Sequence, residues 1–443
     1  MALPKAFQNP KDFFDECIAF LKEYQYLYNF PNTDILVQNV LEKIEVDNLE
    51  NMNVFDKNFK LPAFDILEGF FLKLERLKAI HSVFEEINDL ENSVQVPVSP
   101  KKRHEIVYLA KEVKDVCEEN GCDVVVDFGS GLGYLDQIIF ETSHLKVLGL
   151  ECNSSHYVGA KKRQSKYHAN STENVKYIKH TINENSDSQI EEYLIDKFLN
   201  FYGFCIAGLH ACADLTVVAL DLFLKMEKAK AMVIMPCCYH KMEQEKGIFK
   251  NFPLSECLKE VFEKETGFEF MGVPLLRLGA QPPCLVEDNL EDSVFNLLSR
   301  GVLQLYANKH NCKLKRNKRK AVKTKSMDRN FETYIQDACT GFSLLHNSQP
   351  NTLKEKVDSP EAGDISIDLD ELRSFWREYS SSMVQKKAAI FILLQNCLQP
   401  VIENFILYDR IVYLKENGLN NCQFKRIVNE RISPRCLALM ACK

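Results

Sequence analysis

The sequence lacks the usual signals of secreted and membrane proteins. Its first fifteen residues contain no apolar core like that of a secretory signal. No stretch approaches the roughly 18 uncharged apolar residues that cross a membrane. The 16 cysteines form no Cys-x-x-Cys pair and follow no regular spacing, which argues against a zinc finger or a disulfide framework. We therefore predict free thiols in an intracellular, soluble protein that is cytoplasmic or nuclear, with a mitochondrial location as the alternative.

An excess of positive charge is also missing. Lysine and arginine number 55 against 62 aspartate and glutamate residues, which gives a formal net charge of −7. Nucleic acid could therefore be bound only through a local basic patch. Apolar residues make up 46% of the 443 positions, which is enough for two or three domains with sizeable cores.

Composition and periodicity divide the chain into four segments. Residues 1–95 are acidic, nearly free of glycine and patterned like helices, so we predict an N-terminal helical region. Residues 96–240 form the first part of an α/β domain, and 371–443 form its C-terminal part. Residues 241–370 are then an insertion with a basic run, and its polar end from about residue 347 is predicted to be a loop or disordered.

Short β-branched runs alternate with amphipathic helical stretches through the central segment. Such alternation predicts a mostly parallel sheet covered by helices, the Rossmann-like α/β fold class. Ser99-Pro100 begins the helix before the first strand, and Gly121 ends it. The last two predicted strands would form an antiparallel finish to the sheet. The predicted strands are residues 124–128, 146–150, 175–178, 204–207, 231–235, 422–427 and 436–442.

A glycine-rich turn follows the first strand, with the sequence Asp-Phe-Gly-Ser-Gly-Leu-Gly from Asp127 to Gly133. Glycines let the backbone pass close to a ligand, and the amides at the next helix start face that ligand. Glu151 ends the second strand, 20 residues after Gly131, where a carboxylate can accept both ribose hydroxyls. The pattern favours S-adenosylmethionine over NAD or a turn without a ligand. The predicted cofactor-binding residues are Asp127, Gly129, Ser130, Gly131, Gly133, Tyr134 and Glu151.

Two chemically unusual loops are predicted after the fourth and fifth strands, at residues 208–216 and 236–241. His210, Asp214 and His240 are candidate catalytic residues, because methyl transfer to nitrogen or oxygen often needs a base and an aligned acceptor. Asp214 as a helix cap and His240 as a scaffold residue are the structural alternatives. No metal site is predicted, since adjacent cysteines rarely ligate one ion well. The predicted substrate-binding residues are Lys102, Cys237, Cys238 and Tyr239.

Several of these motifs together resemble the family of methyltransferase-like protein 25. The resemblance implies a class I methyltransferase fold that binds S-adenosylmethionine, and a methyltransferase activity. Ala213 departs from the family pattern, which has glycine there, and no Asn-Pro-Pro-Tyr loop follows the fourth strand, which argues against an adenine dimethylase. The Cys-Cys-Tyr-His loop is similar to the Cys-Cys-His-His loop of a tRNA 2′-O-methyltransferase family. The segments that carry the resemblance are Val98–Glu105, Asp127–Gly133, Gly208–Leu215, Cys237–His240, Tyr408–Arg410 and Ser433–Leu439.

The densest positive charge lies between Lys313 and Lys325. Such a run is typical of phosphate binding, of a nuclear import signal or of a solvated loop. We therefore predict a methyltransferase that acts on a macromolecule, with RNA favoured over protein as the acceptor. The alternatives are a non-catalytic scaffold with the same fold and, less favoured, a dehydrogenase.

Overall fold

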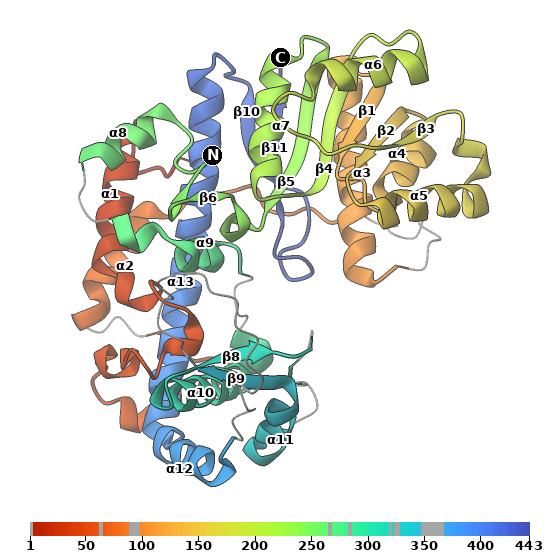
Figure 1. Ribbon diagram of the computed structural model, residues 1–443. Coiled ribbons are helices and arrows are strands. Elements are labelled where there is room, and N and C mark those ends of the chain that lie inside the picture. Colours follow the sequence, from red (N-terminus) through yellow and green to blue (C-terminus); the bar gives the residue numbers. More distant parts are fainter. Residues whose placement is uncertain are drawn as a thin grey trace, which may run out of the picture. The chain divides into compact units, whose positions relative to one another are not determined.

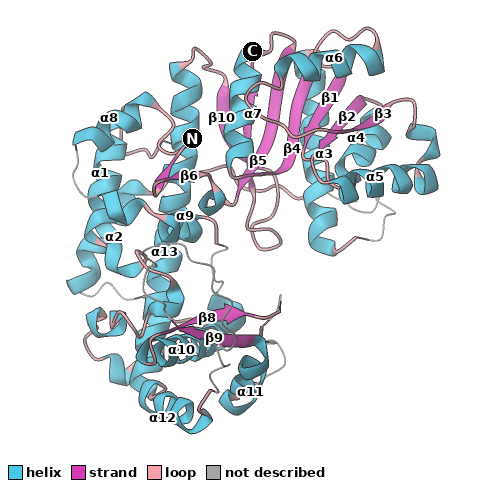
Figure 2. Ribbon diagram, viewed as in Figure 1, coloured by secondary structure: helices cyan, strands magenta, loops and turns pink. Residues whose placement is uncertain are grey.

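A computed structural model defines the fold (Figures 1 and 2). Tertiary contacts divide the chain into two compact units. The first comprises residues 1–21, 75–282 and 399–443, and the second comprises 22–74 and 283–398. The polar stretch predicted from residue 347 lies outside the described residues up to 366. The structure describes residues 3–61, 65–87, 98–264, 268–281, 286–318, 321–322, 328–346 and 367–443.

The first unit is built on a seven-stranded sheet with the order β10-β11-β5-β4-β1-β2-β3. β11 runs antiparallel to both of its neighbours, and the other six strands are parallel to one another. β1 is buried along its whole length, as expected for the apolar run at the centre of a parallel sheet. The predicted Rossmann-like fold is confirmed. The strands are β1 Val124–Phe128, β2 Lys146–Glu151, β3 Val175–Lys179, β4 Phe204–Cys212, β5 Ala229–Cys237, β10 Cys422–Arg426 and β11 Leu437–Cys442.

The helix before β1, α3, begins and ends where the local chemistry predicts. The Ser99 hydroxyl accepts a hydrogen bond from the Lys102 amide at 3.3 Å, with Pro100 in the first turn. Gly121 takes the left-handed conformation that ends this helix. The helix contacts α4, β4 and β5, so it lies against the sheet. The helices of this region are α3 Pro100–Asn120, α4 Tyr134–Ser143, α5 Ser154–Tyr167, α6 Asp187–Phe198 and α7 Asp214–Lys225.

Aromatic packing joins the ends of the chain within the first unit. Phe13 and Phe14 of α1 (Pro10–Glu23) pack against Phe405 and Tyr408 of α13 (Ser382–Glu416), with ring centroids 5.5–5.7 Å apart. The segment after β5 folds into short elements. They are the 3-10 helix Tyr239–Lys241, the hairpin β6 Gln244–Glu245 and β7 Ile248–Phe249, α8 Glu256–Lys264 and α9 Val273–Gly279.

The prediction that no stretch approaches a membrane span is wrong for α13. This helix is long and apolar enough to cross a membrane by length and composition, and 72% of its most apolar window is buried inside the structure. A helix that packs on several sides needs apolar residues on all of them, so a core helix passes the same test.

The second unit packs helices around a two-stranded sheet. The ring of Phe331 stacks on that of Trp376 with centroids 4.3 Å apart, which joins α11 to α12. The four segments predicted from the sequence do not coincide with the two units, because residues 22–74 group with 283–398. The elements of this part of the chain are α2 Asp65–Leu77, α10 Val286–Lys309, β8 Cys312–Arg316, α11 Phe331–Gly341, β9 Phe342–His346 and α12 Leu369–Tyr379.

A buried carboxylate anchors the segment after β5 to α13. Asp409, fully buried, accepts hydrogen bonds from the amides of Leu254 and Ser255 at 2.9 and 2.8 Å. It also accepts hydrogen bonds from the Ser255 hydroxyl at 2.7 Å and from Arg410 at 2.6 Å.

We expect Asp409→Ala to lower the free energy of unfolding by about 3–5 kcal/mol, because it leaves a buried guanidinium and two amides without their partner. Urea unfolding followed by circular dichroism measures the change. Asp196→Ala, at an exposed position, is the control and should stay within about 0.5 kcal/mol of the unmodified chain. Equal midpoints for the two variants would contradict this role of Asp409.

Candidate functional site

The turn after β1 has one open side. Gly129, Gly131 and Gly133 all have positive φ, at 83°, 59° and 71°, a region that side chains rarely adopt. At Gly133 an added Cβ would collide with the Tyr177 hydroxyl, so this glycine is required for packing. At Gly131 the nearest neighbour of an added Cβ would be the Gly129 carbonyl oxygen, 4.0 Å away. A ligand can therefore approach the backbone at Gly131.

Glu151 points at this turn. Its buried carboxylate accepts hydrogen bonds from the Gly131 amide at 2.9 Å, through Oε2, and from the Asn153 amide at 2.7 Å, through Oε1. These two bonds hold the carboxylate beside the open side of the turn. A carboxylate oxygen has a second lone pair, so each can also accept from a ligand hydroxyl. The structure therefore brings Glu151 and the glycine turn together, and binding of a ribose by Glu151 stays a prediction.

A buried polar cluster lies under the same turn. Asp127 is the last residue but one of β1, Asp136 lies in α4, and both side chains are buried to 2% exposure or less. Burial raises the pKa of Asp127 to about 6, and burial together with the neighbouring Asp127 raises that of Asp136 well above its ordinary value. At neutral pH the two carboxyls together therefore carry one proton. Half-buried Lys102 of α3 faces them, and burial lowers its pKa.

Several buried polar atoms around the turn have no hydrogen-bond partner in the protein. They include Asp127 Oδ1 and the Ser130 hydroxyl. Buried polar atoms are rarely left unpaired, so a missing partner indicates that a ligand or water completes the site. The open side of Gly131, the Glu151 carboxylate and these atoms fit a ligand with a ribose and a polar, cationic end, as S-adenosylmethionine has.

Tyr134 lies beside the turn as the first residue of α4, and it is half-buried. The guanidinium of Arg163 in α5 covers its ring at 3.8 Å from the centroid. This cation–π contact holds the ring in place.

The loops predicted after the fourth and fifth strands are shorter than expected, because β4 continues to Cys212 and β5 to Cys237. One extra residue in β4 forms a bulge, since Gly208 pairs with Ile234 and Ala211 pairs with Pro236. A bulge re-aims the side chains next to it. His210 is consequently exposed between two buried neighbours, Leu209 and Ala211.

His210 has a carboxylate partner that sequence reasoning missed. Its Nε2 lies 3.5 Å from Oε2 of Glu105, whose side chain is only 3% exposed. The buried Ser433 hydroxyl donates to Oε1 of the same carboxylate at 2.7 Å. Burial raises the pKa of Glu105, but hydrogen bonds with His210 and Ser433 outweigh it and hold that pKa below its ordinary value. Glu105 and Ser433 both stand in the segments that carry the family resemblance, which was the one signal for them.

Helix α3 links the two parts of the site. Glu105 lies one turn after Lys102 in α3. The Lys102 ammonium interacts electrostatically with Glu105 and with the two buried aspartates. Leu215, at the start of α7, lies 3.6 Å from where a Cβ on Gly129 would be. The His210–Glu105 pair and the glycine turn therefore share the carboxyl-end edge of the sheet, where open α/β sheets bind ligands.

Two other predicted site residues, Asp214 and Tyr239, have hydrogen-bond partners in the protein, whereas Nδ1 of a third, His240, has none. Asp214 accepts from the Glu243 amide at 2.8 Å and from the Asn251 amide group at 2.7 Å, so it holds the β6–β7 hairpin. The buried Tyr239 hydroxyl donates to Glu403 of α13 at 3.1 Å. His240 is half-buried, its Nδ1 has no partner, and burial lowers its pKa, which favours the neutral imidazole.

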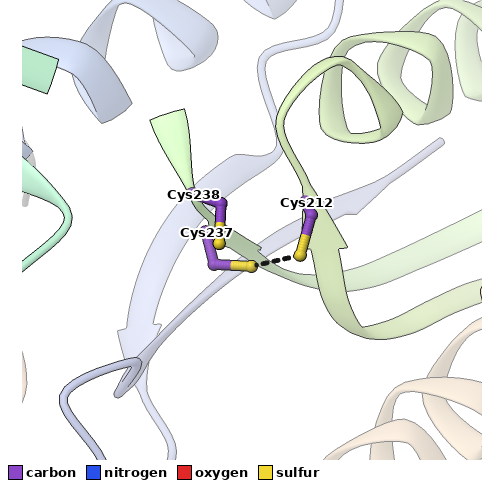
Figure 3. A group of neighbouring side chains, drawn as sticks. All are labelled: Cys212, Cys237 and Cys238. Carbon is purple, nitrogen blue, oxygen red and sulfur yellow. Dashed lines mark hydrogen bonds between the residues drawn. The ribbon is translucent and has the colours of Figure 1, made fainter. Parts of the chain in front are cut away.

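The ends of β4 and β5 bring three thiols together (Figure 3). Cys212 pairs directly with Cys237, and their sulfurs lie 2.9 Å apart. With the Cys238 thiol they form a group whose sulfurs all lie within 4.8 Å of one another. A hydrogen bond with Cys237 lowers the pKa of Cys212 to about 6. Cys237 and Cys238, predicted to face the substrate, thus share one cluster with Cys212.

Comparison with known proteins agrees with this geometry. A family model described as a methyltransferase domain matches residues 101–245. Methyltransferase-like protein 25 of Mus musculus is 23% identical over 278 residues, covering 58% of this chain and 40% of that protein. Its Homo sapiens counterpart is 24% identical over 300 residues, covering 64% and 43%.

The chain spans about two fifths of the length of these curated relatives. Among solved structures, the S-adenosylhomocysteine-bound methyltransferase of Podospora anserina matches with a TM-score of 0.23 and 13% identity, covering 40% of this chain and 72% of that one. By sequence, residues 101–245 match a methyltransferase domain, in a chain that is similar to methyltransferase-like protein 25, and S-adenosylmethionine is the cofactor that such a domain implies.

Proposed function

We propose that this chain is an S-adenosylmethionine-dependent methyltransferase that modifies a macromolecule, with RNA favoured over protein. The observation that carries the proposal is the His210–Glu105 pair at the same sheet edge as the glycine turn. An imidazole held by a buried carboxylate is the usual arrangement of a general base. A fold retained only as a scaffold has no need of it.

The residues around the glycine turn would hold the cofactor, which supplies a methyl group on a cationic sulfur. Glu151 would accept from the ribose hydroxyls, and the free Asp127 oxygen would accept from the cationic end. The open backbone at Gly131 allows close approach. Burial of these carboxylates strengthens their attraction for a cationic ligand, because the local dielectric is low.

His210 would take the proton from the hydroxyl or amine that receives the methyl group. Glu105 would orient the imidazole and stabilise its protonated form, and Ser433 would fix the carboxylate in turn. The exposed position of His210 suits a large acceptor, because a macromolecule cannot enter a closed cavity. Half-buried His240 is the second candidate to contact the acceptor.

RNA is favoured by the exposed cations of the β8 strand. Lys313, Lys315 and Arg316 are exposed there, whereas Lys323 and Lys325 of the same run lie outside the described residues. Exposed cations on an otherwise acidic chain support the proposal of a phosphate-binding surface, whose affinity would fall with salt. Every described cysteine is free, which fits the reducing conditions of the cytoplasm or nucleus.

Methyl transfer from labelled cofactor tests the proposal. Total RNA and total protein from a strain that lacks this gene are the two acceptor pools, because their target atoms are unmethylated. We expect incorporation into RNA that is lost in His210→Ala. Incorporation into protein alone would show that the acceptor is protein and not RNA. Bound cofactor without transfer to either pool would instead indicate a scaffold.

Cofactor affinity should depend on pH through Asp127. Its pKa is raised to about 6, so below that pH the carboxyl takes up a proton and loses its attraction for a cationic ligand. Lys102, Asp136 and Glu151 are the other titratable groups that act on it. We expect the dissociation constant to rise by up to about tenfold per pH unit below about pH 6.

Titration calorimetry at several pH values measures this dependence. Asp127→Asn should bind more weakly at neutral pH and show a flatter profile, since its amide does not titrate in this range. An unchanged profile in that variant would assign the pH dependence to another group.

A further inference from the structure

The thiols of Cys212, Cys237 and Cys238 form a cluster that the proposed methyl transfer does not use. We propose that this cluster is a zinc site, with the three cysteines as ligands. Their sulfurs come from the ends of two neighbouring strands and lie within 4.8 Å of one another. Zinc binds thiolates at about 2.3 Å, so a tetrahedral ion holds its sulfur ligands about 3.8 Å apart. The cluster already has nearly the right size.

Backbone geometry removes the objection that adjacent cysteines cannot share one ion. Along a strand, successive side chains point to opposite faces, so Cys237 and Cys238 should point apart. Cys238 instead has φ 55° and ψ 39°, in the left-handed region. This conformation ends the strand and turns the Cys238 thiol to the side of Cys237 and Cys212 (Figure 3).

The left-handed conformation is unfavourable for a residue with a side chain, and such strain gathers at functional sites. Ala213, the residue after Cys212, also has positive φ, at 54°, and its amide donates to the Cys237 carbonyl at 2.9 Å. Two strained residues thus stand where the two strand ends deliver their thiols. A glycine at position 238 would relax the backbone, yet the sequence places a thiol there.

The chemistry of the donor set favours a soft ion. The group consists of three sulfurs and contains no carboxylate. Thiolates bind zinc well, whereas magnesium and calcium bind oxygen ligands. Cys212 and Cys237 need to separate by about 1 Å from their 2.9 Å contact to reach the spacing of a tetrahedral site. Three protein ligands leave a fourth position for water or for an incoming group, as in zinc sites that are open to a substrate.

Zinc titration of the full chain tests the proposal. The protein is purified reduced and without oxygen, stripped by a chelator, and titrated with zinc against a colorimetric zinc indicator. We expect one tightly held zinc per chain, and cobalt in its place should give the charge-transfer absorption of thiolate ligands. The metal should also raise the melting temperature, because it binds the folded state alone.

Cys238→Gly is the sharpest variant, since it removes one ligand and relaxes the left-handed backbone. It should fold with an equal or higher melting temperature without metal, and lose the tightly held zinc. Cys257→Ser, which alters a half-buried thiol of α8 outside the cluster, is the matched control and should keep it. The proposal is overturned if the reduced protein holds no zinc, or if Cys238→Gly holds as much as the control. Both readouts are independent of methyl transfer.

Discussion

Gly131→Arg is expected to abolish binding of S-adenosylmethionine, weakening it by at least about 100-fold, or about 2.8 kcal/mol. The glycine faces open space beside the Glu151 carboxylate. A long side chain there fills the volume that the ligand needs, and its guanidinium would pair with Glu151 in place of the ribose. Calorimetry on the folded variant measures the loss.

A second glycine provides the matched control for this change. Gly121 has φ 64°, close to the 59° of Gly131, and nothing lies within 4 Å of its added Cβ. Gly121→Arg therefore carries the same backbone penalty at the end of α3, away from the glycine turn. It should bind the cofactor as the unmodified chain does. Unchanged affinity in a folded Gly131→Arg protein would remove the cofactor from this turn altogether.

His210→Ala should lower the rate of methyl transfer by about 10²–10⁴-fold, the usual contribution of a positioned general base. The cofactor dissociation constant should stay the same, because His210 lies on β4 and outside the glycine turn. Single-turnover measurements with bound cofactor separate the chemical step from binding.

Glu105→Gln tests whether the carboxylate acts through the imidazole. Glutamine keeps an acceptor for the Ser433 hydroxyl but removes the charge beside His210. We expect a smaller loss of rate than in His210→Ala, and little further loss when both changes are combined, because the two residues act as a unit. His144→Ala, at an exposed histidine after α4, should be fully active. Additive losses in the double variant would argue against a His210–Glu105 unit.

Much of the cofactor half of the site could be predicted from local sequence. The strand–glycine turn–helix order and the acidic residue at the end of the second strand are short patterns, and each depends on neighbours close in the chain. Gly131 and Glu151 are 20 residues apart, and one parallel strand pair is enough to bring them together. The caps at Ser99 and Gly121 were likewise predictable, because a single side chain or a positive φ decides them.

The residues proposed to act on the methyl acceptor depend on partners that are far away in the sequence. Glu105 and Ser433 are 328 residues apart in the sequence, and no local pattern pairs them. The bulge that exposes His210 arises from the register between β4 and β5. The left-handed Cys238 turns a pair of adjacent thiols, which periodicity places on opposite faces, into one group with Cys212.

The sequence by itself therefore determined the Rossmann-like sheet, its helix caps and the glycine turn with its carboxylate, because these depend on hydrophobic periodicity and on residues a few positions apart. Only the tertiary structure decided which carboxylate orients His210, that Asp214 holds the β6–β7 hairpin, that three thiols meet, and that residues 22–74 group with 283–398. Those outcomes depend on strand register and on packing between segments far apart in the chain, and the free energies that select them come from burial in the folded state.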